Sequence, residues 1–147
     1  MKKKSNPTKK LIKELTKLSH DFIRERDSRS KNEIGGYCFD CNCLAFGPQF
    51  QAGHWHPDST GGALLRYHPY NIHGQAGKCN CKFQQEFVKI NYTFAMEKKY
   101  GKAYCEKLHA LKNKSIKADV IFYSDMIELY KQKDEKKIVA YLENLAK

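Results

Sequence analysis

Between Cys38 and Cys81 the sequence holds five of its six cysteines and four of its six histidines. From about residue 37 to residue 75 this segment is rich in Gly, Pro, Cys and His, and its apolar residues follow no helical repeat. A segment of this composition lacks a regular apolar face that would pack it against the rest of the chain. We therefore expect a compact, irregular region whose shape depends on a cross-link.

The cysteine spacing favours a metal ion as that cross-link. Cys38 and Cys41 are separated by two residues, which lets both thiolates bind one ion from a single turn, and zinc is the usual occupant. Disulfides are rare in the cytosol, where clustered cysteines more often bind metal. Cys79 is expected as the third ligand. The fourth is open among Cys43, Cys81, His73 and water, and the alternative interpretation is a set of thiols without zinc.

Helices are expected on both sides of this region. Before it, Pro7 suits the first turn of a helix, and an apolar stripe follows at helical spacing (Leu11, Leu15, Leu18 and Phe22). After it, a helix from about Cys79 carries a second stripe (Phe83, Phe87, Ile90 and Phe94), and Gly101 suits its end. Further helical segments are expected from about 103 to 112, over 124–130 and over 135–145.

The chain is strongly basic. Its 147 residues include 27 Lys and Arg against 16 Asp and Glu, a formal net charge of +11. An excess of this size attracts polyanions, of which nucleic acid is the commonest, while a charge that serves solubility alone is the alternative. No apolar run approaches the length of a membrane span and no signal segment is visible, so we expect a cytoplasmic protein without a membrane partner.

His54 and Asn80 have the side chains and spacing that phosphodiester hydrolysis needs. The run "FQAGH" predicts a short strand ending near His54, and a histidine there can take a proton from water. Asn71 and His73 come after a long loop, and Asn80 is expected at the start of a helix. A strand, a loop and a helix that carry these side chains form the layout of a ββα-metal (His-Me finger) nuclease site. In such a site one divalent cation stabilises charge on the phosphate.

Each of these residues is given an expected role. His54 would be the general base, and Asn80, helped by His73, would hold Mg²⁺ or Mn²⁺. Asn71 would tie backbone groups of the loop together, and His73 could instead be a zinc ligand or a buried hydrogen-bonding residue. Basic side chains would contact DNA phosphates without reading sequence (Arg24, Arg26, Arg29 and Arg66). His56 and His68 lie beside prolines and are expected to be loop or surface residues.

Several short motifs occur here in the order found in one known family. They are FIRERD (22–27), CFDC (38–41), AGHW (52–55), LRY (65–67), NIHGQ (71–75) and CN (79–80). Over about residues 15 to 110 the chain thereby resembles the NinG, or Rap, recombination proteins of lambda-like phages. The resemblance implies a relative of the HNH nucleases, an endonuclease that acts on branched DNA intermediates in the cytoplasm of the bacterial host.

The chain departs from the family's pattern in two places. Ala76 stands where the family has a cysteine, three residues before Cys79, so a site with four cysteines is not matched. The residues before His54 are Gln, Ala and Gly, whereas many relatives carry an acidic residue in this stretch. Asp58 is the nearest carboxylate in the sequence. Beyond about residue 112 the resemblance ends.

Together these observations predict an α+β fold with a small HNH-like ββα-metal core, stapled by zinc and flanked by helices. We expect a basic tail and helix over 1–36, the nuclease core over 37–100 and a helical extension over 101–147. The predicted function is structure-selective, metal-dependent cleavage of branched recombination DNA of the Holliday junction or D-loop type. Other phage recombination proteins are expected partners, and a homodimer would supply the two active sites that junction resolution needs.

Two other functions are consistent with the sequence. The first is an HNH nuclease that cuts linear duplex DNA, because nothing among the expected site residues separates a linear from a branched substrate. The second is a zinc-stabilised DNA-binding protein without catalysis, which Ala76 and the missing carboxylate before His54 favour.

Overall fold

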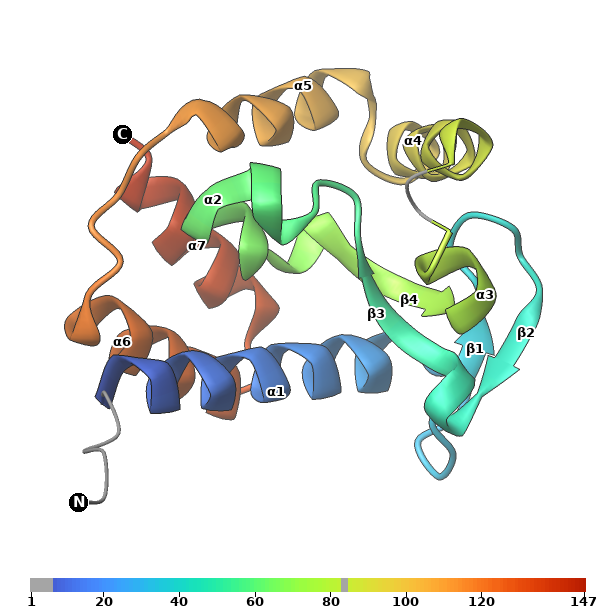
Figure 1. Ribbon diagram of the computed structural model, residues 1–147, viewed down its shortest axis with the longest axis horizontal. Coiled ribbons are helices and arrows are strands. Elements are labelled where there is room, and N and C mark those ends of the chain that lie inside the picture. Colours follow the sequence, from blue (N-terminus) through green and yellow to red (C-terminus); the bar gives the residue numbers. More distant parts are fainter. Residues whose placement is uncertain (1–6, 83–84) are drawn as a thin grey trace, which may run out of the picture.

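A computed structural model describes residues 7–82 and 85–147 and has an α+β fold, as the sequence predicts (Figure 1). Two antiparallel sheets of two strands each lie among the helices. β1 (Gly35–Tyr37) pairs with β2 (Leu44–Phe46), and β3 (Phe50–His54) pairs with β4 (Ile72–Ala76). Lys2 to Lys4, in the expected basic tail, lie outside the described residues.

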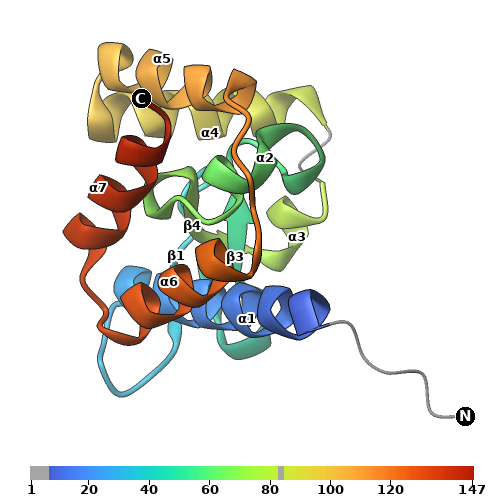
Figure 2. The ribbon, with the colours of Figure 1, turned by 90° about the vertical axis from the view of Figure 1, so that its left-hand side faces the viewer.

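Seven helices are present in the described part of the chain. They are α1 (Pro7–Asp27), α2 (Asp58–Arg66), α3 (Gly77–Asn80), α4 (Glu86–Tyr100), α5 (Lys102–Ala110), α6 (Val120–Lys131) and α7 (Glu135–Leu145). Figure 1 shows α1 on one side of the β3–β4 pair and α4 and α5 on the opposite side, and Figure 2 shows α6 beside α1. None of these helices is long and apolar enough to cross a membrane.

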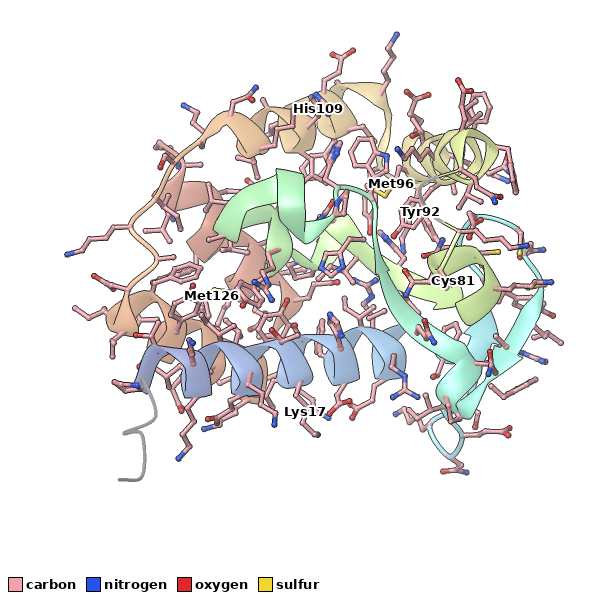
Figure 3. The ribbon with its side chains drawn as sticks, in the orientation of Figure 1. Lys17, Cys81, Tyr92, Met96, His109 and Met126 are labelled. Carbon is pink, nitrogen blue, oxygen red and sulfur yellow. The ribbon has the colours of Figure 1, made fainter. Side chains whose placement is uncertain are left out.

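The α1 helix begins at Pro7, as predicted, and its apolar face forms the centre of the main core. Leu15 and Ile23 are fully buried, and Phe22 packs edge-on against Tyr130 of α6 with ring centroids 5.5 Å apart. Met126 of α6 lies in the space between α1 and α2 (Figure 3). The segment after residue 112 thus packs directly against the N-terminal helix.

The α4 helix ends at Gly101, whose φ of 82° suits glycine, and this part of the prediction is confirmed. The expected buried face is wrong: Phe87 and Phe94 are 58% and 65% exposed. The buried side chains are Val88, Tyr92 and Met96, and Figure 3 shows the last two on the side of α4 that faces the β3–β4 pair. Phe83, the first residue of the expected stripe, lies outside the described residues.

Tyr92 explains why α4 packs on this face. Its hydroxyl donates a hydrogen bond to the Gly53 carbonyl at 2.8 Å, and its ring is fully buried. Beside it, the indole N–H of Trp55 donates to the Thr93 hydroxyl at 3.0 Å. These two hydrogen bonds join one side of α4 to β3 and to Trp55, the residue that follows β3.

Two boundaries differ from the sequence prediction. The segment around residues 56–71, expected to be a loop, contains α2, because Leu64 and Leu65 are each buried in a different core cluster. The helix is kinked at Gly62, which has a φ of 66°. Asn80 is the last residue of the short α3 helix and not the first residue of a long one, since α4 begins only at Glu86.

Candidate active site and metal centre

The β3–β4 pair presents His54 at one end, opposite Ile72. The His54 Nε2 atom lies 3.0 Å from the Arg66 carbonyl oxygen at the end of α2. A carbonyl oxygen only accepts hydrogen bonds, so Nε2 carries the hydrogen and Nδ1 carries the lone pair. For a neutral ring, the contact therefore favours the tautomer that has its lone pair on Nδ1.

A hollow of ≈ 390 Å³ lies between α1, β3 and α3. The residues that line it are Lys17, His20, Asp21, Arg24, Pro48, Phe50, Gln51, Ala52 and Asn80. His20 also packs edge-on against His54, with ring centroids 5.7 Å apart, so it joins the hollow to the expected base. His20 was not predicted from the sequence, because no motif or spacing distinguishes it from other helical residues.

Asn80 is half-buried on the wall of this hollow. Its side-chain N–H donates to the Gln51 Oε1 atom at 2.9 Å, which leaves the Asn80 carbonyl oxygen as an acceptor. The carboxylate of Asp21 at the same hollow is paired with Lys17 at 2.6 Å. Hard cations prefer oxygen ligands, and these donors fit Mg²⁺ in kind but offer few charges.

Asn71 is fully buried and closes the loop that contains α2. Its side-chain oxygen accepts from the His56 backbone N–H at 2.9 Å. Its side-chain N–H group donates to the carbonyls of His56 at 3.0 Å and Leu65 at 2.9 Å. These are backbone groups of the loop, so Asn71 makes the type of contact expected from the sequence.

His73 is fully buried, and aromatic residues occupy its surroundings. Its Nδ1 and Nε2 atoms lie 3.2 Å and 2.8 Å from the hydroxyls of Tyr92 and Tyr100, and its ring stacks on Phe39 at a centroid distance of 3.8 Å. Burial holds its pKa well below the ordinary value. Both ring nitrogens are thus used inside the fold, so we leave His73 out of the proposed catalytic and metal-binding residues.

Two of the four expected DNA-binding arginines have internal partners. Arg26 uses all five N–H donors, on the carboxylates of Asp27 and Glu135 and on the carbonyls of Pro69 and Ile72. Its side chain is 17% exposed. This network joins α1 to β4 and α7, so we leave Arg26 out of the proposed DNA contacts.

Arg24 donates to the carbonyls of Phe50 at 2.7 Å and Gly47 at 2.8 Å, and so holds the start of β3 against α1. Arg29 is exposed, with its guanidinium 5.3 Å from the centre of the Tyr37 ring. Arg66 is half-buried, with its guanidinium 5.5 Å from the Tyr67 ring centre. Of the expected set, Arg29 is therefore the side chain best placed to reach a phosphate from the surface.

His68, expected in a loop or at the surface, is fully buried. Its Nδ1 atom accepts from the Tyr70 backbone N–H at 3.2 Å. Burial lowers its pKa to about 4, an effect that Glu143 opposes and Lys107 reinforces. The prediction failed because Pro69 begins a short 3₁₀ turn (Pro69–Asn71) that tucks this segment under α7 and not into solvent.

Cys38, Asp40, Cys41 and Cys79 form the candidate metal centre. One ligand atom from each lies within 4.8 Å of the others, and this is the only such group of His, Cys, Asp or Glu among the described residues. The Cys79 and Cys41 Sγ atoms are 3.4 Å apart, and Cys38 Sγ is 2.8 Å from an Asp40 oxygen. The 38–41 turn and α3 thus meet at the predicted cross-link, and this cluster could hold a metal ion such as zinc.

Asp40 is the ligand candidate that the sequence analysis missed. Its carboxylate oxygen accepts from the Gln75 side chain at 3.1 Å, which directs it toward the cysteines. Of the other candidates, Cys43 has its Sγ atom 3.2 Å from that of Cys41, and Cys81 is exposed with its thiol on the Lys78 carbonyl. His73 contacts tyrosines instead. The sequence did carry a signal for Asp40, since it is an acidic residue inside the CFDC turn.

The thiols of the cluster differ in acidity. Burial raises the pKa of Cys38, and a hydrogen bond to Asp40 raises it further. Burial and a hydrogen bond to Cys41 raise the pKa of Cys79 to about 12. Burial also raises the pKa of Cys41, but hydrogen bonds from Cys43 lower it overall. A metal that binds here must displace these protons, so binding would release protons and weaken in acid.

Comparison with known proteins identifies one family. The family model described as bacteriophage lambda NinG protein matches residues 1–138, so the similarity continues past residue 112, where the sequence motifs end. Neither the curated proteins nor the solved structures include a match to this chain. The match covers most of the chain, including α1, both sheets, the cysteine cluster and most of the C-terminal helices. The chain therefore belongs to the bacteriophage lambda NinG family, a phage family associated with recombination.

Proposed function

We propose that this protein is a DNA endonuclease with His54 as its general base. The observation that carries the proposal is the 3.0 Å contact between His54 Nε2 and the Arg66 carbonyl, which puts the lone pair on Nδ1. A neutral imidazole held in one tautomer can take a proton from a water molecule as that water attacks phosphorus. His20 connects this histidine to a hollow that a phosphate could enter.

The order of elements supports a His-Me finger arrangement. β3 carries His54, β4 follows antiparallel to it, and α3 carries Asn80 on the wall of the hollow. Asn71 sits between the two strands and fixes the intervening loop. In this proposal the cysteine cluster holds α3 against the turn at residues 38–41, which keeps Asn80 in place relative to β3.

Asn80 would hold Mg²⁺ or Mn²⁺ through its side-chain oxygen, with Gln51 beside it and the substrate phosphate completing the ligand set. When bound, such an ion stabilises negative charge on the phosphate. No carboxylate stands on β3 before His54, and Asp21 is paired with Lys17. The proposal therefore includes weak ion binding by the protein alone and stronger binding in the presence of DNA.

Branched recombination DNA is the proposed substrate. The net charge of +11 favours a polyanion, and the family is associated with phage recombination. Arg29 and Lys17 would contact phosphates, which position DNA without reading its sequence. Selection by shape and not by sequence agrees with such contacts.

A nuclease assay tests the proposal. A four-way junction and a linear duplex of matched sequence are incubated with the protein in Mg²⁺, in Mn²⁺ and in EDTA. We expect metal-dependent cleavage of the junction in preference to the duplex. His54→Ala should lower the single-turnover rate by about 10²–10⁴-fold with little change in DNA affinity, because a general base acts in the transition state. His109→Ala, in an exposed histidine of α5, is the control and should cleave normally.

The other outcomes are informative. Equal cleavage of junction and duplex would show that the protein cuts DNA without regard to branching. Junction binding without cleavage in any metal would favour the zinc-stabilised DNA-binding protein, for which the cysteine cluster and the missing carboxylate are the supporting observations. A His54→Ala protein that cleaves at the wild-type rate would remove His54 from the reaction.

A further inference from the structure

One face of the β1–β2 pair carries apolar side chains that are open to solvent. Tyr37 and Leu44 lie opposite each other in the register, and Phe46 follows Leu44 by two residues, so the three side chains project from the same face. Each of them is between 43% and 49% exposed. The opposite face carries Ala45, which is buried in a core cluster. We call the exposed surface formed by Tyr37, Leu44 and Phe46 the β1–β2 face.

The aromatic rings of this face are held in position by their neighbours. Phe46 lies across the backbone of Gly35, since a Cβ atom on Gly35 would collide with the Phe46 ring. The Arg29 guanidinium lies 5.3 Å from the centre of the Tyr37 ring, a cation–π distance. Rings that are already ordered lose little conformational entropy when a ligand stacks on them. The β1–β2 face is therefore prepared to bind a flat, apolar group.

Positive charge surrounds the β1–β2 face. Arg29 and Lys31 are exposed in the segment before β1, which also carries the carboxylate of Glu33. On the other side Lys78 of α3 is exposed and interacts with Cys43, the residue before β2. Aromatic rings beside cations form the combination that binds bases and phosphates of nucleic acid together. The chemistry of this surface thus matches DNA that exposes the flat faces of its bases.

The β1–β2 face lies near the hollow and apart from the proposed base. Figure 1 shows β1 and β2 at the end of the molecule where β3 begins. A short 3₁₀ turn (Gly47–Gln49) leads from β2 into β3, and Pro48 of this turn lines the hollow. His54 lies at the far end of β3. DNA could therefore contact this face while one of its phosphates occupies the hollow.

We propose that the β1–β2 face selects branched DNA, with Tyr37 and Phe46 stacking on bases that have lost a stacking neighbour at the branch point. This rests on the proposed function, because it explains how the same branched substrate is recognised. In a linear duplex the interior base pairs are stacked on both sides. At an open branch point the first pair of each arm lacks a neighbour on one side, and apolar side chains can cover it. Such stacking is independent of sequence.

DNA binding without added Mg²⁺ or Mn²⁺ tests the proposal, because the junction is then open at its centre and binding is measured without cleavage. The affinities of the full-length protein for a four-way junction and for a linear duplex of matched sequence are compared. We expect the wild type to prefer the junction. Tyr37→Ala should weaken junction binding by about 5–100-fold, the effect of losing one stacked base, and should change duplex binding little. Phe46→Ala is a second variant with the same expected result.

Two controls complete the binding experiment. Tyr37→Phe keeps the ring and should bind the junction as the wild type does. Phe94→Ala removes an exposed aromatic ring of α4, away from the β1–β2 face, and should leave both affinities unchanged. The circular dichroism spectrum of each variant reports whether it is folded.

A fluorescent adenine analogue, 2-aminopurine, reports the stacking directly, because stacking quenches its fluorescence. Saturating wild-type protein should quench the analogue at the branch point and should leave an analogue in the middle of one arm unchanged. Tyr37→Ala at saturating concentration should quench it less. Unchanged or increased fluorescence at the branch point with the wild type would overturn the proposal.

The outcomes separate this inference from the proposed function. A junction preference that survives in Tyr37→Ala and in Phe46→Ala, or an equal loss of junction and duplex binding in both folded variants, would overturn this inference alone. Equal binding of junction and duplex by the wild type would overturn it together with the branched substrate, while leaving His54 as the base. A preference that depends on Tyr37 in a protein that cleaves no DNA would support this inference and overturn the nuclease.

The β1–β2 face could instead bind a second copy of this chain. Sedimentation of the wild type and of Tyr37→Ala distinguishes this case. We expect the same oligomeric state for both proteins. A wild-type dimer that becomes a monomer in Tyr37→Ala would make the face an interface between two copies and would overturn the assignment to DNA.

Discussion

The side chain of Asn71 binds both backbone groups of His56, accepting from its N–H at 2.9 Å and donating to its carbonyl at 3.0 Å. The same side chain donates to the Leu65 carbonyl, so one amide joins the start of the α2 loop to its end. His54 and Arg66, the residues of the proposed base contact, stand just outside these two anchors. The position of the base therefore depends on Asn71.

Replacement of Asn71 by Ala should destabilise the protein. Three hydrogen bonds of a buried amide are lost, each worth about 1 kcal/mol, and unpaired backbone groups remain, so we expect a loss of about 2–4 kcal/mol. Urea unfolding measures it. Asn91→Ala, at an exposed asparagine of α4, should change stability by less than about 0.5 kcal/mol. Equal stability of both variants would show that the loop is held by other contacts.

Protein purified without added metal should contain about one zinc ion per chain, because three cysteines and Asp40 bring four donor atoms together. Elemental analysis measures this content. Cys38→Ser should lose the zinc, whereas Cys81→Ser should keep it, since Cys81 is exposed and its thiol contacts the Lys78 carbonyl. A folded, active protein without zinc would show that packing alone holds α3 in place.

The fourth ligand is expected to be Asp40 and not Cys43. Asp40 is directed at the cluster by Gln75, whereas Cys43 contacts the cluster only through Cys41. Cobalt substituted for zinc absorbs in proportion to the number of thiolates bound, so its spectrum should indicate three. Asp40→Ala should weaken metal binding, and Cys43→Ser should leave the spectrum unchanged. A spectrum of four thiolates that loses one in Cys43→Ser would assign the position to Cys43.

Local sequence patterns were sufficient for some of these features. The spacing of apolar residues gave α1, and the alternation in "FQAGH" gave β3 with His54 at its end. The CxxC spacing gave two members of the cysteine cluster, and the loop position of Asn71 suggested its contacts with the backbone. For α1, β3 and the Cys38–Cys41 pair, the decisive neighbours lie within a few residues or follow from a fixed helical or strand period, whereas the Asn71 contacts span one loop.

The features that were missed depend on contacts between distant segments. α4 is apolar on two sides, so its periodicity could not show that Tyr92 would be drawn to the Gly53 carbonyl while Phe94 stays exposed. Arg26 looked like a surface cation because its partner Glu135 lies on α7. His20 looked like any polar residue of α1 until the fold placed it against His54. Sequence spacing carries no information on such pairs.

Arg26 of α1 and Arg29, which lies just beyond the end of α1, provide a matched test of structural and DNA-binding roles. Arg26→Ala removes one partner from two carboxylates and two carbonyls inside the fold, so it should cost about 3 kcal/mol or more. Arg29→Ala should leave stability nearly unchanged. It should lower junction affinity and reduce the slope of log K against log salt by about one, the effect of one lost phosphate contact. Unchanged affinity and slope in Arg29→Ala would exclude this contact.

The buried His68 should make the protein sensitive to mild acid. Its pKa is lowered from 6.5 to about 4 by burial, so the unfolded chain takes up a proton at a pH where the folded chain does not. The associated stability is fully present above pH 6.5 and is lost as the pH falls toward 4. At 1.36 kcal/mol per pH unit, the loss between pH 6.5 and about pH 5 is about 2 kcal/mol.

Urea unfolding of the wild type and of His68→Gln at about pH 7.5 and about pH 5 measures this effect. Glutamine can accept a hydrogen bond as His68 does from the Tyr70 N–H, but it does not titrate. The wild type should therefore lose about 2 kcal/mol more than the variant over this interval. Both proteins carry the same cysteine cluster, so its own response to acid cancels in the comparison. The same pH dependence in both would mean that His68 takes up its proton without leaving the fold.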